Sequence, residues 1–184
     1  DGVAGLRAMD AENLIDGAAR AGYFPLGTID GRILPKQLVE VFDLGEQAPV
    51  PLIAGFNSGE IRSLRFLPPP APSDAASYET KIRSLYGDLA SDFLKLYPSG
   101  NLEESVLATT RDALYGWTAE RLVQKQTALG QPAFLYLFDH GYPAATAAGL
   151  HAFHAAELPY GFGTADRTPP RWPKVPSMAE EVAL

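Results

Sequence analysis

The sequence predicts an α/β protein, in which two strands of a parallel sheet flank a mainly helical stretch. The apolar run at residues 50–56 and the aromatic-rich run at residues 133–138 are continuous, as is typical of strands buried on both faces. Between them, apolar side chains recur at helical spacing over residues 78–127. This order indicates the α/β class, with residues 68–130 as a mainly helical insertion between two sheet strands.

The region before the first strand is predicted to hold short helices and a turn. Asp10 precedes an acidic turn and apolar residues, the pattern of a helix N-cap, and Gly17 or Gly22 ends that helix. Residues 30–31, Asp-Gly, indicate a turn, and residues 36–42 indicate another short helix.

The helical insertion follows a proline-rich break at residues 68–74, which cannot be helix interior. Three apolar stripes come next: Tyr78, Ile82, Leu85 and Tyr86; Leu89, Phe93, Leu96 and Tyr97; and Val106, Thr110, Leu114 and Trp117 with Leu122 and Val123. Gly87 is placed as the residue after a helix, and Pro98 stops the second stripe. Residues 167–176 hold four prolines and are predicted to be loop, and residues 178–184 turn helical.

Composition excludes several function classes. The net charge is −7, and no basic cluster is present, which argues against binding to nucleic acid. The absence of cysteine excludes a disulfide, a thiolate metal site and a cysteine nucleophile. No apolar run reaches 18 residues, so no membrane span is predicted.

The two ends of the chain suggest that it was cut from a longer polypeptide. Residues 1–6 have neither a basic region nor an apolar stretch, so no signal peptide is predicted there. The chain does not begin with Met, and residues 178–184 end without a helix cap. The compartment stays open between secreted or periplasmic and cytoplasmic.

Acids and histidines beyond the strand ends make hydrolysis the first chemistry to test. Ligand sites of open α/β sheets lie outside the carboxyl ends of the strands. Glu60 follows the first predicted strand, and His154 follows the second at a greater distance. From the residues alone, Glu60 is better explained as an acid in a first helical turn, and His154 as a core histidine.

Four motifs carry a resemblance to a known family. Residues 52–60, Leu-Ile-Ala-Gly-Phe-Asn-Ser-Gly-Glu, resemble the strand and Gly-x-Asn-x-x-Glu signature of type B carboxylesterases, the α/β-hydrolases that include cholinesterases and bacterial para-nitrobenzyl esterases. Residues 154–163 resemble that family's signature around the catalytic histidine, His-x-x-Glu followed by an apolar residue, an aromatic residue and Phe-Gly. Residues 24–25 leading to 29–35, and the Tyr-x-Phe-Asp strand that ends at Asp139, agree with the same family in order and spacing.

The resemblance implies the C-terminal part of an α/β-hydrolase fold and a Ser-Glu-His triad in that chain order. Glu60 is then the acid and His154 the base, with a carboxylate oxygen about 2.6–3.2 Å from His154 Nδ1. The chain has no Gly-x-Ser-x-Gly and no oxyanion loop. The serine and the oxyanion hole are therefore expected in an absent N-terminal part of the same enzyme. The implied protein is a serine carboxylesterase for small-molecule esters that needs no cofactor, and this segment alone is expected to be inactive.

Four residues are expected to bind substrate, namely Tyr23, Leu64, Leu67 and Ala155. In the family frame they fall near the triad, and the small Ala155 leaves open space beside the base. A core role is the alternative for them, since most aromatic and apolar side chains pack in the interior.

Other residues near the base have simpler roles. His151 is a competitor to His154 but lacks the motif found after His154, and His140 is expected in a loop. His151, His154 and Glu157 recur at spacings of three, but no distant ligand accompanies them, so no metal site is predicted. Glu157 is expected to be a structural acid.

Two rival functions remain open. A catalytically inactive, esterase-like binding or adhesion module would lack Gly-x-Ser-x-Gly upstream, although the presence of both Glu60 and His154 favours the enzyme. An autonomous small α/β domain would fold cooperatively by itself, which the exposed edges of two isolated strands disfavour.

Overall fold

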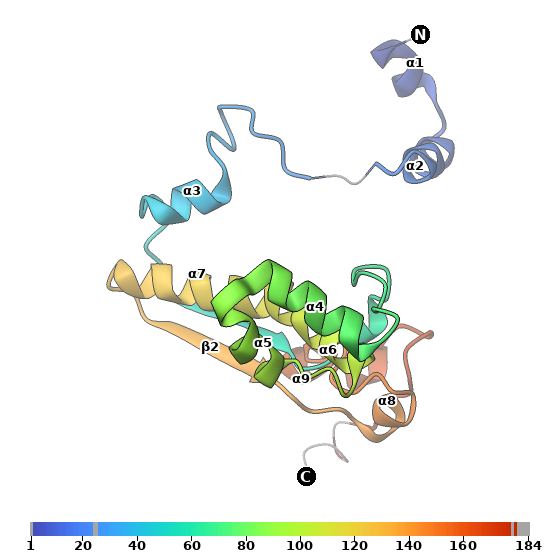
Figure 1. Cartoon of the computed structure of the whole chain (residues 1–184). Coiled ribbons are helices and arrows are strands. Elements are labelled where there is room, and N and C mark those ends of the chain that lie inside the picture. The colour runs from blue at the N-terminus through green and yellow to red at the C-terminus, as the bar shows by residue number, and fades with distance from the viewer. Residues whose placement is uncertain (1, 24–25, 178, 180–184) are drawn as a thin grey trace. The chain divides into compact units, whose positions relative to one another are not determined.

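The computed structural model describes residues 2–23, 26–177 and 179 and divides the chain into two compact units, Asp1–Gln47 and Ala48–Leu184. Both strands lie in the second unit (Figure 1). Two sequence expectations lie outside the described residues: the Phe-Pro pair at 24–25, and most of the C-terminal helical turn at 178–184.

The unit Asp1–Gln47 contains short helices joined by turns. These helices are α1 (Val3–Ala8), α2 (Ala11–Arg20) and α3 (Leu38–Asp43). Asp10 caps α2 as predicted, because its side chain accepts hydrogen bonds from two backbone N–H groups of the first turn. The helix continues through Gly17 and ends before Gly22, which has a φ of 71°. Asp30 accepts three backbone hydrogen bonds and closes the predicted turn.

The sheet of the second unit consists of two parallel strands, β1 (Leu52–Asn57) and β2 (Ala133–Phe138). β2 begins and ends at the predicted residues, and β1 starts two residues later than predicted. The predicted burial on both faces is wrong: Ile53 is 71% exposed and Phe134 is 62% exposed. Within the described part of this unit, α7 (Trp117–Ala128) and the turn before it are the elements that pack closely on the strands, so much apolar sheet surface stays uncovered.

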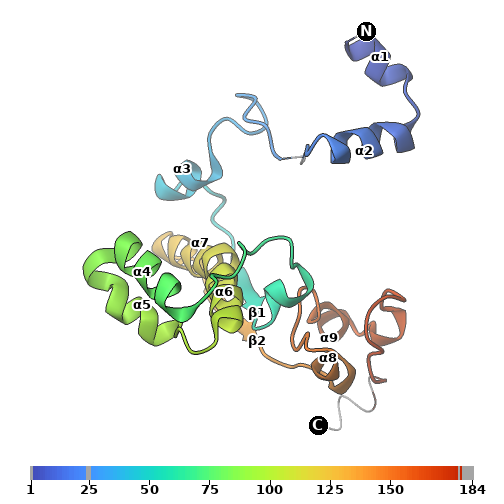
Figure 2. The same ribbon diagram turned by 45° about the vertical axis from the view of Figure 1, so that its right-hand side comes forward.

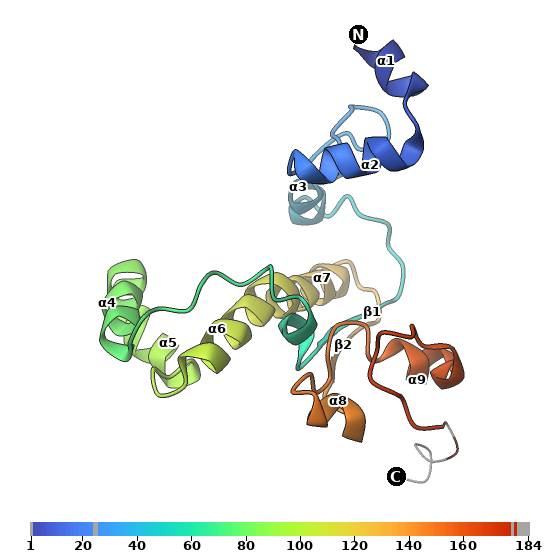
Figure 3. The same ribbon diagram turned by 90° about the vertical axis from the view of Figure 1, so that its right-hand side faces the viewer.

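Helices between the strands form a layer on one side of the sheet. They are α4 (Ala75–Tyr86), α5 (Ala90–Leu96), α6 (Leu102–Arg111) and α7, with a 3-10 turn at Gly87–Leu89. Figures 2 and 3 show α4 and α5 on one side of the strands and the short helices α8 (Pro143–Ala147) and α9 (Leu158–Phe162) on the other. Tyr78, Ile82 and Ala90 form a small core where α4 packs on α5. Gly87 ends α4 with a φ of 51°, as predicted.

The third predicted helix is interrupted by a π-helical turn at Asp112–Gly116. One extra residue in a turn rotates all subsequent side chains by about 100°. The residues of the predicted apolar stripe therefore do not all lie on one face of the helix: Val106 in α6 is buried, whereas Trp117, after the π turn, is 56% exposed. The buried positions of α7 include Ala119 and Gln126 instead.

A second core holds the segment that carries His154. Buried members of this core are Tyr142, Ala145, Phe153, Ala156, Ala165 and Val175. The ring of Phe153 meets that of Trp172 edge to face at 4.8 Å, and the Tyr142 hydroxyl donates a hydrogen bond of 2.9 Å to the Pro173 carbonyl. The irregular stretch after the 3-10 turn Ala165–Arg167, predicted as loop, thus packs back against the residue that precedes His154.

Candidate active site

The turn after β1 places the predicted acid. β1 ends at Asn57, and a 3-10 helix, Glu60–Ser63, begins three residues later. Gly59 lies between them, and its N–H donates a hydrogen bond of 2.9 Å to the carbonyl of Ala152. A Cβ at Gly59 would lie 2.7 Å from the carbonyl oxygen of Leu150. Only glycine therefore lets residues 58–60, which we call the acid turn, come this close to residues 150–152.

Glu60 and His154 meet, although 94 residues separate them in the sequence. Glu60 Oε2 lies 2.5 Å from His154 Nδ1, slightly less than the expected range. Glu60 Oε1 accepts a hydrogen bond of 3.0 Å from the Asn57 N–H, so both carboxylate oxygens are engaged. The Glu60 side chain is 6% exposed and the His154 side chain 45%. The alternative that His154 is a core histidine is therefore wrong, because its side chain is half-exposed.

This geometry suits a general base. An ionised Glu60 only accepts hydrogen bonds, so the proton between the pair resides on His154 Nδ1. The other ring nitrogen, Nε2, is then left unprotonated and can take a proton from a hydroxyl. The buried carboxylate also stabilises the imidazolium that would result.

Asn57 links the acid turn to residues 151–157, which carry His154 and which we call the base turn. Its side chain is fully buried, and Nδ2 donates to the Phe153 carbonyl at 2.9 Å and to Glu157 Oε2 at 2.5 Å. Its backbone N–H supports Glu60. Sequence reasoning assigned no role to Asn57, and the signal that marked it was its place in the first family motif. Glu157 accepts one of these hydrogen bonds, which agrees with the structural role expected of it.

The base turn stores backbone strain. His151 and Ala155 have φ values of 53° and 69°, where a Cβ crowds the neighbouring carbonyl. Residues held in this region cluster at functional sites, because the surrounding packing must enforce them. Here the two strained residues flank Phe153 and His154.

A cavity of about 430 Å³ opens beside His154. Its lining consists of Ser63, Leu64, Leu150, Phe153, His154, Ala155, Arg171, Trp172 and Pro173. Two of the expected substrate-binding residues, Leu64 and Ala155, thus share a cavity with the candidate base. Leu67 is not part of the lining, and Tyr23 is exposed in the other unit, so a role for either stays a prediction.

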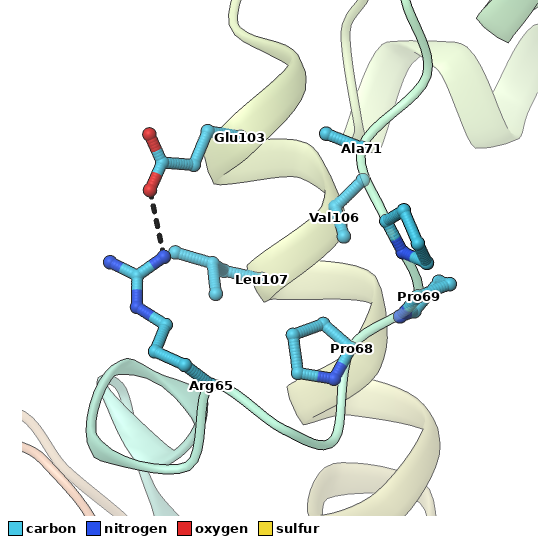
Figure 4. A pocket seen from close by; sticks show the side chains of 8 residues that line it. Arg65, Pro68, Pro69, Ala71, Glu103, Val106 and Leu107 are labelled. Carbon is cyan, nitrogen blue, oxygen red and sulfur yellow. Dashed lines mark hydrogen bonds and ion pairs between the residues drawn. The ribbon is translucent and has the colours of Figure 1, made fainter.

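Another hollow, of about 420 Å³, lies between the proline-rich segment and α6 (Figure 4). Its charged groups, Arg65 and Glu103, bind each other at 2.7 Å. No predicted site residue lines it. The hollow offers a neutralised ion pair and apolar walls, so of these two cavities the one beside His154 is the better candidate site.

The remaining histidines have different surroundings from His154. The ring of His140 packs edge-on against Tyr160 at 5.2 Å, and His151 is exposed. Among the residues that the structure describes, no group of three His, Cys, Asp or Glu side chains is arranged to hold a metal ion. None of the described helices has the length and apolar character needed to cross a membrane.

No family model matches the chain, and no curated protein matches its sequence. Solved structures do match. Carboxylesterase EST55 of Geobacillus stearothermophilus at pH 6.2 has 21% identity and a TM-score of 0.62 over 97% of this chain and 38% of that chain. The same enzyme at pH 6.8 has 20% identity and a TM-score of 0.56, covering 89% and 33%. EstA of Aspergillus niger has 20% identity and a TM-score of 0.54, covering 77% and 29%.

The chain thus spans about a third of the length of the structures it matches. At this level of identity the similarity shows the fold. It confirms the predicted α/β class, and the parallel strands with their helical layer correspond to part of a larger sheet protein. The chain therefore has, in part, the α/β-hydrolase fold found in carboxylesterases.

Proposed function

We propose that this chain is the C-terminal portion of a serine carboxylesterase, a member of the type B family that its motifs resemble. The observation that carries the proposal is the 2.5 Å contact between a buried Glu60 carboxylate and a half-exposed His154 imidazole. The fold shared with a carboxylesterase supports it. The nucleophilic serine and the oxyanion hole belong, in this proposal, to an N-terminal part of the same enzyme.

The reaction then takes the general course of triad hydrolases. The serine attacks the ester carbonyl while His154 Nε2 takes its proton, and Glu60 stabilises the charged imidazole. His154 gives the proton to the leaving alcohol. Water, activated by the same base, then releases the acyl group from the serine. Each step needs only these residues and water, so the proposal includes no cofactor.

The cavity beside His154 is the proposed place for part of the ester. Leu64 and Ala155 would give it an apolar wall for an acyl or alcohol chain, and Arg171 adds one charged side chain to the lining. Ala155 adds only a methyl group next to the base, so space remains there for substrate.

The test is hydrolysis of a short-chain nitrophenyl ester by the intact protein. His154→Ala should lower kcat by about a million-fold, as is typical when a triad base is lost. Glu60→Gln should lower it by about 10⁴-fold, because an amide can donate to Nδ1 and favour the wrong tautomer. His140→Ala is the matched control and should keep kcat, since that ring packs against Tyr160 outside the triad.

Two results would contradict the proposal. Full hydrolysis by His154→Ala would remove the proposed base from the mechanism. Absence of hydrolysis in the unaltered intact protein would instead favour the inactive, esterase-like binding module.

A further inference from the structure

The π turn Asp112–Gly116 brings an aromatic ring to the candidate base. The ring centroids of Tyr115 and His154 lie 5.6 Å apart, and their planes are inclined by 46°. An aromatic ring attracts a cation within about 6 Å of its centroid, so a protonated His154 would lie within reach. π turns inside helices occur frequently at functional sites.

Contacts on both sides of Tyr115 hold the π turn in place. Arg111, directly before the turn, donates from Nη1 to the Ser58 carbonyl at 3.0 Å, which links the turn to the segment that carries Glu60. Asp112 accepts hydrogen bonds of 2.6 Å from Arg111 Nε and 2.8 Å from the Tyr97 hydroxyl. The start of the turn is therefore fixed both to the acid segment and to the helical layer.

The end of the turn lies against the sheet. A Cβ on Gly116 would be in ordinary van der Waals contact with the Phe56 ring, at 3.4 Å, so Gly116 packs next to β1. Because β1 leads directly into the acid turn, this contact brings Tyr115 towards the Glu60–His154 pair. An uninterrupted α-helix would give residue 115 and the residues after it a different rotation about the helix axis.

The phenol of Tyr115 is suited to act as a neutral ring. Burial raises its pKa above the ordinary value, and the negative charge of Glu60 raises it further. The hydroxyl therefore stays protonated throughout the pH range in which an imidazole titrates. Tyr115 can contribute ring electrons next to His154, but no second negative charge.

We propose that Tyr115 is a positioning residue for His154, which keeps the imidazole against Glu60 and stabilises the imidazolium formed during each proton transfer. This inference rests on the proposed function for its catalytic meaning. Glu60 holds the ring at Nδ1, and Tyr115 lies beside it. Because the attraction comes from the ring and not from the hydroxyl, phenylalanine should serve equally well.

The test uses three variants of the intact protein. Tyr115→Leu keeps an apolar group but removes the ring, and Tyr115→Phe keeps the ring. Tyr86→Leu is the matched control, because Tyr86 stacks on Phe93 at 4.5 Å within the helical layer. For each variant, NMR gives the titration midpoint of His154, identified by the signal that His154→Gln removes, and ester hydrolysis gives the pH dependence of kcat/KM.

Tyr115→Leu should lower the His154 midpoint by about half a pH unit, because the charged form loses a favourable contact. The acid limb of the kcat/KM profile should move by the same amount. Tyr115→Phe should keep the midpoint and the profile of the unaltered protein, and so should Tyr86→Leu. Loss of packing alone would not produce this pattern, since leucine remains apolar.

An unchanged midpoint in Tyr115→Leu, or an equal shift in Tyr86→Leu, would overturn the inference. If Tyr115→Leu does not fold, Tyr115→Met repeats the comparison, and the ring-current shift of the His154 Hε1 proton tests the contact in the unaltered protein and in Tyr115→Phe. Failure of the proposed function is separable: the NMR shift would persist in a protein that hydrolyses no ester. Conversely, if hydrolysis depends on His154 but Tyr115→Leu leaves the titration midpoint of His154 unchanged, the role of Tyr115 is refuted and the proposed function stands.

Discussion

Replacing Asn57 with alanine removes a side chain that joins the acid turn to the base turn. Asn57 Nδ2 donates to the Phe153 carbonyl and to the Glu157 carboxylate. The backbone N–H that supports Glu60 remains after the truncation. The substitution therefore weakens the link between the two turns and leaves the direct support of the acid in place.

The magnitude follows from the two bonds that are lost. A hydrogen bond to a neutral carbonyl contributes about 0.5–1.5 kcal/mol, and one to a carboxylate about 1.5–3 kcal/mol. The Phe153 carbonyl does not become freely hydrated, because Phe153 is 2% exposed and Asn57 is fully buried, whereas Glu157 is partly exposed. We expect Asn57→Ala to lower the free energy of unfolding by about 3 kcal/mol, and to lower kcat as the base turn loses its fixed position.

Urea unfolding of the intact protein, followed by tryptophan fluorescence, measures this loss. Trp172 packs on Phe153 and reports directly on the base turn. Asn13→Ala, at an exposed position of α2, is the matched control and should change the free energy of unfolding by less than about 0.5 kcal/mol. A loss below about 1 kcal/mol for Asn57→Ala, with unaltered kcat, would refute the role given to this residue.

Three further substitutions probe the same region and the helical layer. Gly59→Ala should lower the thermal midpoint and kcat together, because its Cβ would lie 2.7 Å from a backbone carbonyl; an unchanged kcat would contradict this. Ala155→Gly should raise the free energy of unfolding by about 0.5–1 kcal/mol by relieving a φ of 69°, and a decrease would count against stored strain. Burial, together with the hydrogen bond to Asp112, raises the pKa of Tyr97 to about 12 from 10. The unfolded chain loses this proton first, so stability should fall as the pH rises from 10 towards 12, and Tyr97→Phe should flatten that slope in urea titrations; equal slopes would contradict it.

Local signals predicted much of the fold. β2 is one continuous apolar run, and α4 ends at Gly87, where a residue without a Cβ adopts a positive φ. The π turn could not be predicted in this way, since a helical stripe assumes constant rotation per residue, and Asp112–Gly116 breaks that assumption. Trp117 consequently turned out exposed.

The candidate site depended on a different kind of signal. Periodicity alone left Glu60 and His154 with ordinary roles, and the family motifs identified both. Asn57 donates a hydrogen bond to the carboxylate of Glu157, 100 residues later in the chain. No local sequence pattern predicts a contact over that separation. The same holds for the ring of Tyr115, whose approach to His154 depends on the π turn.

The separation of Glu60 from His154 also has a consequence for how the protein is made. During synthesis Glu60 leaves the ribosome 94 residues ahead of His154, a delay of about 5–20 s at ordinary elongation rates. Helices α4 to α7 consist of sequence-local contacts and can fold within that interval, far faster than translation proceeds. The nascent chain thus carries Glu60 without His154 until most of this segment has been translated, and the Glu60–His154 pair is completed only when the core around Phe153 is in place.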